Sequence, residues 1–195
     1  MVVAAPAAAA ELIALIFGPP GSGKGTQAAR IEKEFSLTHL STGEILRAEA
    51  MRGGELGSQA ARMAKGELVP DDLVERIVEN RLREEGDANV LLDGFPRTLD
   101  QARALDSMLA TGGRAVDLVL VLEVPDEEVV RRLLHRAEVE RRGDDTPEAI
   151  RERLEEYREL TMPVLDYYRA KGVRVAEIDA LGTVEEVGAR IAKAL

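Results

Sequence analysis

A run of glycines around one lysine is the part of this sequence best suited to chemistry. Residues 18–26 read GPPGSGKGT and lie between an apolar segment, 12–17, and a segment of helical spacing, 24–34. Glycines at such a junction let successive backbone N–H groups curl around an anion, and the following helix adds its positive N-terminal end. Lys24 supplies a mobile cation that can stay with a phosphoryl group in transit. The run therefore predicts a cradle for the phosphates of a nucleoside triphosphate.

The cradle departs from the general phosphate-loop pattern at one position. Gly25 stands where Ser or Thr usually follows the lysine, and Thr26 comes one residue later. Because that hydroxyl normally ligates Mg²⁺, we expect the ion to be held elsewhere, through water molecules. Asp93 follows the apolar segment 90–92, and a carboxylate at the tip of a buried strand beside a phosphate loop can hold Mg²⁺ or its water shell.

Two further turns carry candidate binding groups. Residues 93–97 read DGFPR, in which Gly94 and Pro96 favour a rigid turn that aims Arg97 into the same cleft. A helix beginning at Thr98 then carries Gln101 on its first turns. Residues 41–47 read STGEILR, where a hydroxyl can cap a helix, and a plain cap and a ligand contact fit this stretch equally well.

Arginines crowd residues 131–153, although the chain as a whole is acidic. Arg132 and Arg136 are four residues apart and therefore share one helical face. The helical pattern fails over 137–146, so we expect a short lid there, with Arg142 on it and Arg153 on the next helix, both able to reach a polyphosphate. We interpret the remaining members of the cluster as solvated residues that pair with nearby glutamates: Arg131, Arg141 and Arg151.

Three other residues receive structural interpretations. His39 and His135 lack a partner set for metal binding or nucleophilic chemistry. Pro163 is expected to bend or break the helical stretch 147–171, because proline removes a helical hydrogen bond.

Composition excludes several classes of function. Lys and Arg number 26 against 36 Asp and Glu, which gives a net charge of −10 and argues against a nucleic-acid surface or an anionic membrane as partner. Cysteine is absent, so disulfides and thiolate zinc sites are excluded, and the cytoplasm is the expected compartment. Residues 1–10 are Ala-rich and lack a basic start, so they predict a disordered tail rather than an export signal.

Five apolar segments alternate with segments of helical period: 12–17, 37–40, 90–92, 116–122 and 173–178. Strands separated by helices form parallel sheets with helices on both faces, so the chain predicts a three-layer α/β/α fold in one domain, 1–195. In such sheets ligands bind beyond the carboxyl ends of the strands, where every motif above lies. The chain between 41 and 70 exceeds one crossover helix and predicts a small flap over a second site.

The motifs GPPGSGKGTQ (18–27), STGEILR (41–47), DGFPRTLDQ (93–101) and RGDDTPEAIRERLEEY (142–157) resemble adenylate kinase, in that family's order and along almost the whole chain. The resemblance implies a P-loop kinase fold with a five-stranded parallel sheet, a helical monophosphate-binding flap at 41–70 and a lid at 137–146. The lid lacks the inserted hairpin and zinc-binding cysteines of longer members, so the chain is similar to the short-lid bacterial type. The implied reaction is ATP + AMP ⇌ 2 ADP with Mg²⁺.

The resemblance also implies roles for individual residues. ATP would be held by Gly21, Ser22, Gly23, Lys24, Gly25, Thr26, Arg132, Arg136 and Gly182, the last beside adenine. AMP would be held by Thr42, Arg47, Glu67, Leu68, Val69, Gly94, Phe95, Pro96, Arg97, Gln101, Arg142 and Arg153. The implied catalytic set is Lys24, Arg97, Arg132, Arg142 and Arg153, with Asp93 holding the water shell of Mg²⁺.

Two alternatives stay open at this point. A UMP/CMP kinase is the nearest, although that family generally differs at the positions of Thr42 and Gln101, which here favour adenine. The other is a P-loop nucleotide-binding module that regulates a protein partner. A monomer is expected, because a single sheet with two covering layers accounts for the apolar stripes.

Overall fold

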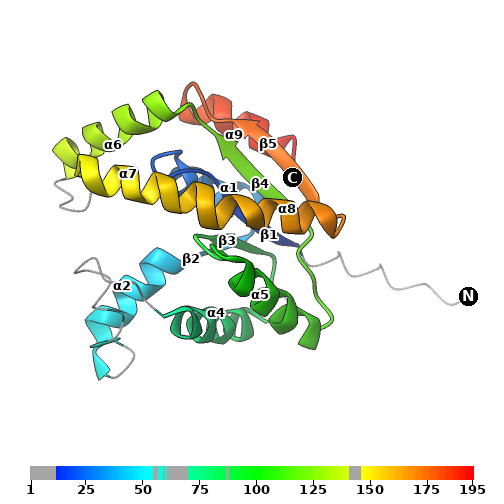
Figure 1. Ribbon diagram of the computed structural model, residues 1–195. Helices are drawn as coiled ribbons and strands as arrows, with labels where there is room; N and C mark the ends of the chain where they lie inside the picture. Colours follow the sequence, from blue (N-terminus) through cyan, green and yellow to red (C-terminus); the bar gives the residue numbers. More distant parts are fainter. Residues whose placement is uncertain (1–11, 55–56, 59, 61–69, 87, 141–145) are drawn as a thin grey trace, which may run out of the picture.

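A five-stranded parallel sheet forms the centre of the described part of the chain (Figure 1). The structure is a computed structural model that describes residues 12–54, 57–58, 60, 70–86, 88–140 and 146–195, the side chains of 136–140 excepted. The strands are β1 (Ile13–Phe17), β2 (Thr38–Ser41), β3 (Val90–Asp93), β4 (Leu118–Glu123) and β5 (Arg174–Asp179), in the order β2-β3-β1-β4-β5. This arrangement confirms the predicted α/β fold.

Helices connect the strands and cover both faces of the sheet. They are α1 (Lys24–Phe35), α2 (Thr42–Arg52), α4 (Asp71–Glu85), α5 (Leu99–Thr111), α6 (Asp126–Glu140), α7 (Pro147–Glu156), α8 (Met162–Ala170) and α9 (Val184–Ala192), with a π-helical turn, η1 (Tyr157–Thr161), between α7 and α8. None of these described helices has the length and hydrophobicity needed to cross a membrane.

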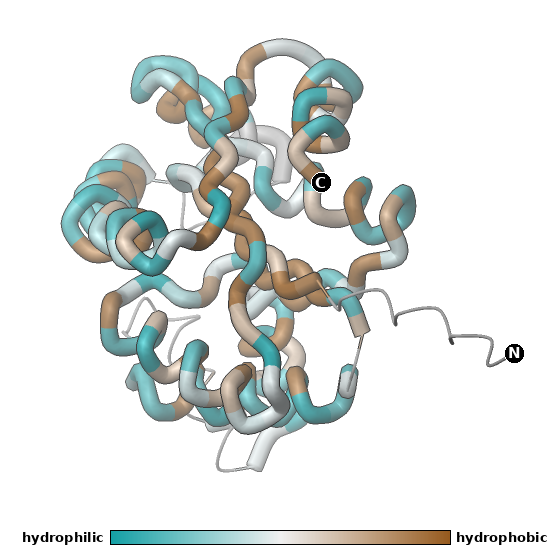
Figure 2. The backbone as a smooth tube through the Cα atoms, turned by 90° about the vertical axis from the view of Figure 1, so that its right-hand side faces the viewer, coloured by the Kyte–Doolittle hydropathy of each residue, from teal (hydrophilic) through white to brown (hydrophobic). Residues whose placement is uncertain are grey.

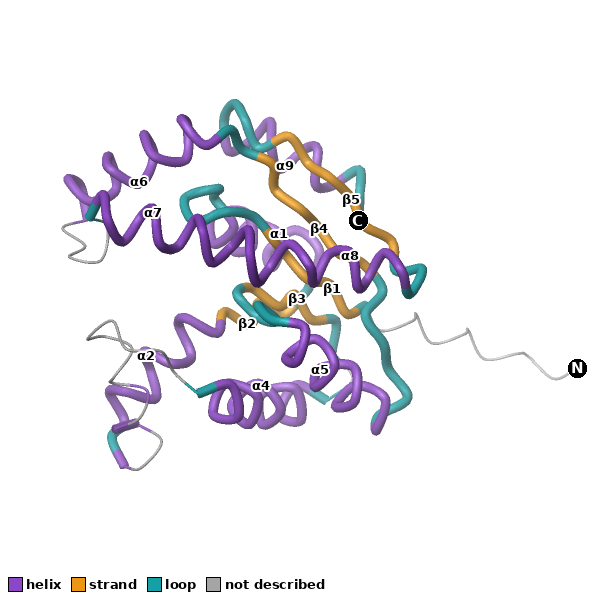
Figure 3. Tube along the Cα trace, viewed as in Figure 1, coloured by secondary structure: helices purple, strands orange, loops and turns teal. Residues whose placement is uncertain are grey.

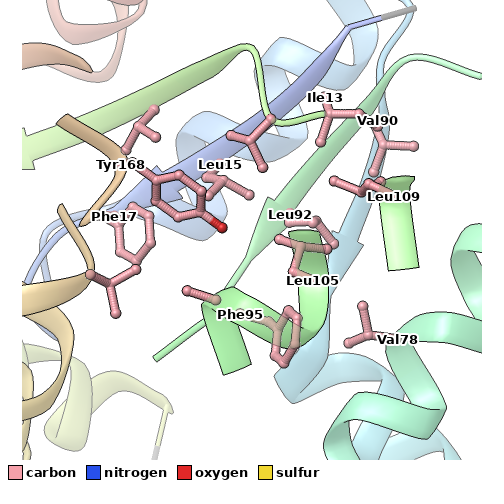
Figure 4. Close-up of a cluster of buried hydrophobic side chains, with 14 of the residues drawn as sticks. Ile13, Leu15, Phe17, Val78, Val90, Leu92, Phe95, Leu105, Leu109 and Tyr168 are labelled. Atoms are coloured by element: carbon pink, nitrogen blue, oxygen red, sulfur yellow. The ribbon is translucent and has the colours of Figure 1, made fainter. Parts of the chain in front are cut away.

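Alternate residues of the central strand pack into opposite halves of the core. Ile13 and Leu15 lie in the cluster that β-strand side chains form with α4, α5 and α8 (Figure 4), whereas Ala14 and Ile16 pack with α1 and α9. This follows from the period of two along a strand. Because both faces of the sheet are covered at its centre, the middle strand β1 is apolar throughout, and Figure 2 shows hydrophobic segments running through the middle of the molecule.

The segment from α6 to α8 differs in detail from the sequence prediction. α6 continues to Glu140, so part of the range expected to be a loop is helical. Thr146 then caps α7 by accepting a hydrogen bond from the Ala149 N–H at 3.2 Å. Near Pro163 the regular α-helix is interrupted, as predicted: the π-helical turn η1 separates α7 from α8, and the helical path continues past the proline.

The sheet brings the predicted motifs to one edge. The glycine run follows β1, the Asp93 turn follows β3, and α2 begins directly after β2. Since β3 and β4 pair with β1 in parallel on its two sides, the loops that follow β3 and β4 flank the glycine run that follows β1. In Figure 3 the loop after β1 is drawn between α6 and α7, and the loop after β3 between α7 and α2.

Candidate active site

A cleft of about 720 Å³ opens at the carboxyl edge of the sheet. Its walls come from the glycine run, the start of α2, the turn after β3, α6, and the segment from α7 to η1. Of the predicted site residues, those that line it are Gly21, Gly23, Lys24, Gly25, Thr26, Arg47, Asp93, Gly94, Pro96, Arg97, Arg132 and Arg153. One cleft therefore gathers lysine and arginine side chains from segments far apart in the sequence.

The glycine run has the backbone shape that an anion cradle requires. Gly21 and Gly23 have φ of 80° and 93°, angles that side-chain-bearing residues rarely adopt. A Cβ atom at Gly21 would also come within 2.8 Å of Leu133 Cγ on α6. Lys24 Nζ donates hydrogen bonds to the carbonyls of Gly18 and Pro19, at 2.6 and 3.0 Å. These bonds hold the ammonium group over the loop, at the place where phosphates would lie.

Arg132 joins α6 to the glycine run. Its guanidinium donates to Glu128 Oε1 at 2.7 Å, to the Ser22 carbonyl at 3.4 Å and to the Ala180 carbonyl at 3.0 Å. Hydrogen bonds from Arg131 and Arg132 lower the pKa of Glu128 to about 2. The carboxylate is thus ionised at neutral pH and orients Arg132 along the wall of the cleft.

The turn after β3 presents Arg97 to the opposite end of the cleft. Gly94 has φ of 84°, and its carbonyl accepts a hydrogen bond from Arg97 Nε at 2.9 Å. Desolvation by the surrounding walls of the cleft lowers the pKa of Arg97, although the residue stays accessible to solvent; the charge of Asp93 opposes this shift, whereas the charge of Arg153 adds to it. The guanidinium groups of Arg97 and Arg153 repel each other, so a bound anion would stabilise the pair.

Asp93, at the tip of β3, has His39 of β2 as a neighbour. His39 Nε2 lies 3.4 Å from Asp93 Oδ2. Burial lowers the pKa of His39, but its hydrogen bond to Asp93 and the charges of Asp93, Glu44 and Glu32 outweigh burial, so the pKa is raised. The sequence predicted a structural role for His39. The structure adds that its ring orients the Asp93 carboxylate at the wall of the cleft.

The residues around Asp93 fit Mg²⁺ bound through water. Among the described residues no group of three or more His, Cys, Asp or Glu side chains could hold a metal ion. Mg²⁺ usually keeps several waters and binds one or two carboxylates together with substrate phosphates. A single carboxylate facing the cradle, as Asp93 does, meets that requirement.

Several predicted residues lie behind the wall of the cleft. Ser22, Thr42 and Gln101 are buried, and Thr42 Oγ1 donates to the Asp93 carbonyl at 3.2 Å. Phe95 packs into the core cluster of Figure 4, so its backbone and not its ring is available to a ligand. Gly182, in the loop after β5, is not among the residues that line the cleft.

Other predicted residues cannot be placed. Glu67, Leu68, Val69 and Arg142 lie outside the described residues, as do the tail at 1–10 and the centre of the expected lid. For Arg136 the structure describes the backbone, within α6.

Sequence reasoning missed two groups of residues that line the cleft. Arg131 pairs with Glu128 at 2.7 Å as expected, yet it also lines the cleft together with His135, one turn further along α6. Arg131 and His135 are four residues apart and share a helical face, and this spacing next to Arg132 could have indicated that they line the cleft. The second group comes from the end of α7 and from η1: Glu156, Tyr157, Leu160 and Thr161. Burial, aided by the charge of Glu123, raises the pKa of Tyr157 to about 12, so its hydroxyl stays protonated.

Comparison with known proteins agrees with this geometry. The profile of the family described as adenylate kinase matches residues 16–173. Adenylate kinases from Thermus thermophilus and Thermobifida fusca are 53% and 48% identical over 185 and 183 residues, which is 93% of this chain and 96% of each relative. Adenylate kinase from Stenotrophomonas maltophilia (strain R551-3) is 45% identical over 93% of this chain and 97% of its own length. The chain therefore belongs to the adenylate kinase family and is a nucleoside monophosphate kinase that converts ATP and AMP to two ADP.

Proposed function

We propose that the cleft binds ATP at the glycine run and AMP at the Arg97 end, and that the γ-phosphoryl group passes directly between them. The observation that carries this assignment is the convergence of cationic side chains in one cleft: Lys24, Arg47, Arg97, Arg131, Arg132 and Arg153. A cleft with this charge suits two polyphosphate chains placed end to end.

The residues divide the work of the transfer. Phosphoryl transfer needs alignment of the two nucleotides and stabilisation of charge on the equatorial oxygens, with no covalent intermediate on the protein. Lys24 would leave the carbonyls of Gly18 and Pro19 and follow the transferred group. Arg132 and Arg136 would hold the donor phosphates, Arg47 and Arg97 the acceptor phosphate, and Arg142 and Arg153 the junction.

Mg²⁺ accompanies ATP in this proposal. When bound, the ion offsets phosphate charge. Asp93 would hold its water shell, and His39 would keep the Asp93 carboxylate turned toward the cleft. Thr26 faces the same cleft one residue after the usual ligating position, so its hydroxyl is available to a phosphate oxygen or to a water.

Water must be kept from the transferred group, because it competes with AMP as acceptor. The cationic side chains come from separate segments, and the full set would be assembled only when both nucleotides are bound. The flap at 41–70 and the lid at 137–146 remain the proposed closing elements.

AMP is the acceptor, and Thr42 and Gln101, which are buried behind the wall of the cleft in this structure, are the residues we propose to favour its adenine base. We further infer that the chain acts as a monomer in the cytoplasm, with ATP, AMP and ADP as its partners and neither nucleic acid nor membrane.

A coupled assay of ADP formation tests the proposal. ATP would be held constant, and AMP, UMP, CMP and GMP would be compared as acceptors, with and without Mg²⁺. We expect rapid Mg²⁺-dependent turnover with AMP alone. Faster turnover with UMP or CMP would transfer the assignment to a pyrimidine acceptor, and slow ATP hydrolysis without an acceptor would favour a regulatory nucleotide-binding module.

A further inference from the structure

The main chain of Arg97 is held from two sides by side chains of distant elements. Gln101 Oε1, on α5, accepts a hydrogen bond from the Arg97 N–H at 2.7 Å. Thr161 Oγ1, on η1, donates to the Arg97 carbonyl at 3.2 Å, across 64 residues of sequence. Gln101 and Thr161 are 5% and 8% exposed, so water competes little for these bonds.

The network continues from Gln101 to the start of α4. Gln101 Nε2 donates to Asp71 Oδ1 at 2.7 Å, and Thr98 Oγ1 donates to Asp71 Oδ2 at 3.4 Å. The Arg97 N–H needs an acceptor and the Asp71 carboxylate needs a donor, so the two together fix the orientation of the Gln101 amide. We call the series Asp71, Gln101, Arg97 and Thr161 the Arg97 relay.

The π-helical turn explains how Thr161 reaches Arg97. Pro163 has no N–H to give to the carbonyl four residues before it, and its ring crowds that carbonyl. The Met162 N–H bonds the Tyr157 carbonyl, five residues back, which widens the turn. As a result Leu160 and Thr161 both face the cleft. The turn before Pro163 thus delivers a side chain to the site.

We propose that Thr161 and Asp71 are positioning residues, which align Arg97 for the monophosphate from the two sides of its main chain. This rests on the proposed role of Arg97 in binding that phosphate. Arg97 Nε is itself tied to the Gly94 carbonyl at 2.9 Å, so a shift of the main chain moves the guanidinium with it. Small displacements of an aligning group are costly in transfer reactions. The glycine run shares none of these bonds, so ATP binding is independent of the relay.

Steady-state kinetics of Thr161→Val and Thr161→Ser tests the positioning role of Thr161. Valine matches threonine in shape but cannot donate, whereas serine keeps the hydroxyl. We expect Thr161→Val to lower kcat/KM for AMP by about three- to tenfold, with the KM for ATP within about twofold of the parent, and Thr161→Ser to restore the AMP value. An unchanged kcat/KM for AMP, or an equal change for both nucleotides, would overturn the role of Thr161.

The positioning role of Asp71 is tested by comparing it with the neighbouring carboxylate of Asp72. Asp71 and Asp72 both lie in the first turn of α4, so each substitution by alanine removes one acidic charge from the same helix end. Only Asp71 belongs to the relay. Asp71→Ala should therefore lower kcat/KM for AMP by about three- to tenfold, while Asp72→Ala should keep the parent value. Equal losses of kcat/KM in the two variants would mean that Asp71 acts only through its negative charge at the helix end. That result would overturn its positioning role.

Arg97→Ala separates failure of the relay from failure of the proposed function. If Arg97→Ala leaves kcat/KM for AMP unchanged, the role of Arg97 itself is wrong. If it is impaired while Thr161→Val and Asp71→Ala match the parent, Arg97 keeps its role and the relay is wrong. Thermal unfolding of each variant, compared with the parent, identifies any loss that comes from destabilisation of the fold.

Discussion

The two ends of the cleft are built in different ways. The phosphate-loop end is centred on one continuous segment, 18–26, whose shape depends on glycine backbone angles, and Arg132 of α6 is bonded to it through the Ser22 carbonyl. The Arg97 end is assembled from β3, α4, α5 and η1, joined by side-chain hydrogen bonds over as many as 64 residues. In Figure 1, α4 and α5 lie at the bottom of the view, whereas α7 passes across its middle. In the proposed function, a mainly local motif would therefore hold ATP, and side chains joined across several elements would hold AMP.

Lys24→Ala should give the largest effect, since it removes the cation that would accompany the transferred group. We expect kcat to fall by about 10²- to 10³-fold, because preorganised charge at a transition state is worth that much in comparable sites. Lys33→Ala, in the last turn of the same helix, is the control and should match the parent. An active Lys24→Ala enzyme would remove this lysine from the mechanism.

Arg97→Ala examines the other end of the cleft. The variant should lose about 10²-fold in kcat/KM for AMP and much less for ATP, because the guanidinium would contact the acceptor phosphate. Arg103→Ala is the matched control, since Arg103 is an exposed arginine on α5 that pairs with Asp100 at 3.1 Å. Equal losses for both nucleotides would show that the ends of the cleft are not distinct.

Paired glycine substitutions sharpen the comparison. Gly21→Ala and Gly94→Ala both place a Cβ at positive φ, and both meet a close atom: Leu133 Cγ at 2.8 Å and Thr42 Oγ1 at 2.7 Å. Each should cost about 1–3 kcal/mol of folding free energy through backbone strain. Gly21→Ala should raise the KM for ATP, and Gly94→Ala the KM for AMP. Thermal melting and steady-state kinetics measure both quantities, and an interchange of the two KM effects would contradict the assignment.

Glu128→Gln should have the smallest effect, visible as a change with pH. The pKa of Glu128 is about 2 in the folded chain, below its ordinary value of 4.5, because Arg131 and Arg132 donate to it. A carboxylate with a depressed pKa stabilises the fold above its unfolded pKa, and this contribution disappears as the pH falls through the folded value. The stability difference between parent and variant should therefore be constant above about pH 5 and shrink toward about pH 2. A difference that is independent of pH over this range would rule out the ion pairs as its cause.

Local signals in the sequence predicted most of the fold and several residues at each end of the cleft. The apolar segments matched the five strands to within about two residues at each end, and for β1, β3 and β4 this signal reflects burial on both faces of the sheet. The glycine run, Lys24 and the turn at Arg97 were recognisable because their chemistry requires particular residue types at fixed spacing.

Contacts between distant segments could not be predicted in the same way. The pairing of His39 with Asp93 depends on β2 lying beside β3, and the bond from Thr161 to Arg97 depends on the path of η1. Neither is expressed in the neighbouring sequence. Pro163 indicated a bend, but not that the bend turns Thr161 toward the cleft.

Titration calorimetry with diadenosine pentaphosphate tests the central claim most directly, because this molecule joins two adenosines by a phosphate chain long enough for both ends of the cleft. We predict that one molecule binds per chain, that it prevents binding of both ATP and AMP, and that Arg97→Ala weakens it more than it weakens ATP. Binding of ATP and AMP in competition for a single pocket, with ATP and diadenosine pentaphosphate equally affected by Arg97→Ala, would contradict a cleft built from two distinct ends.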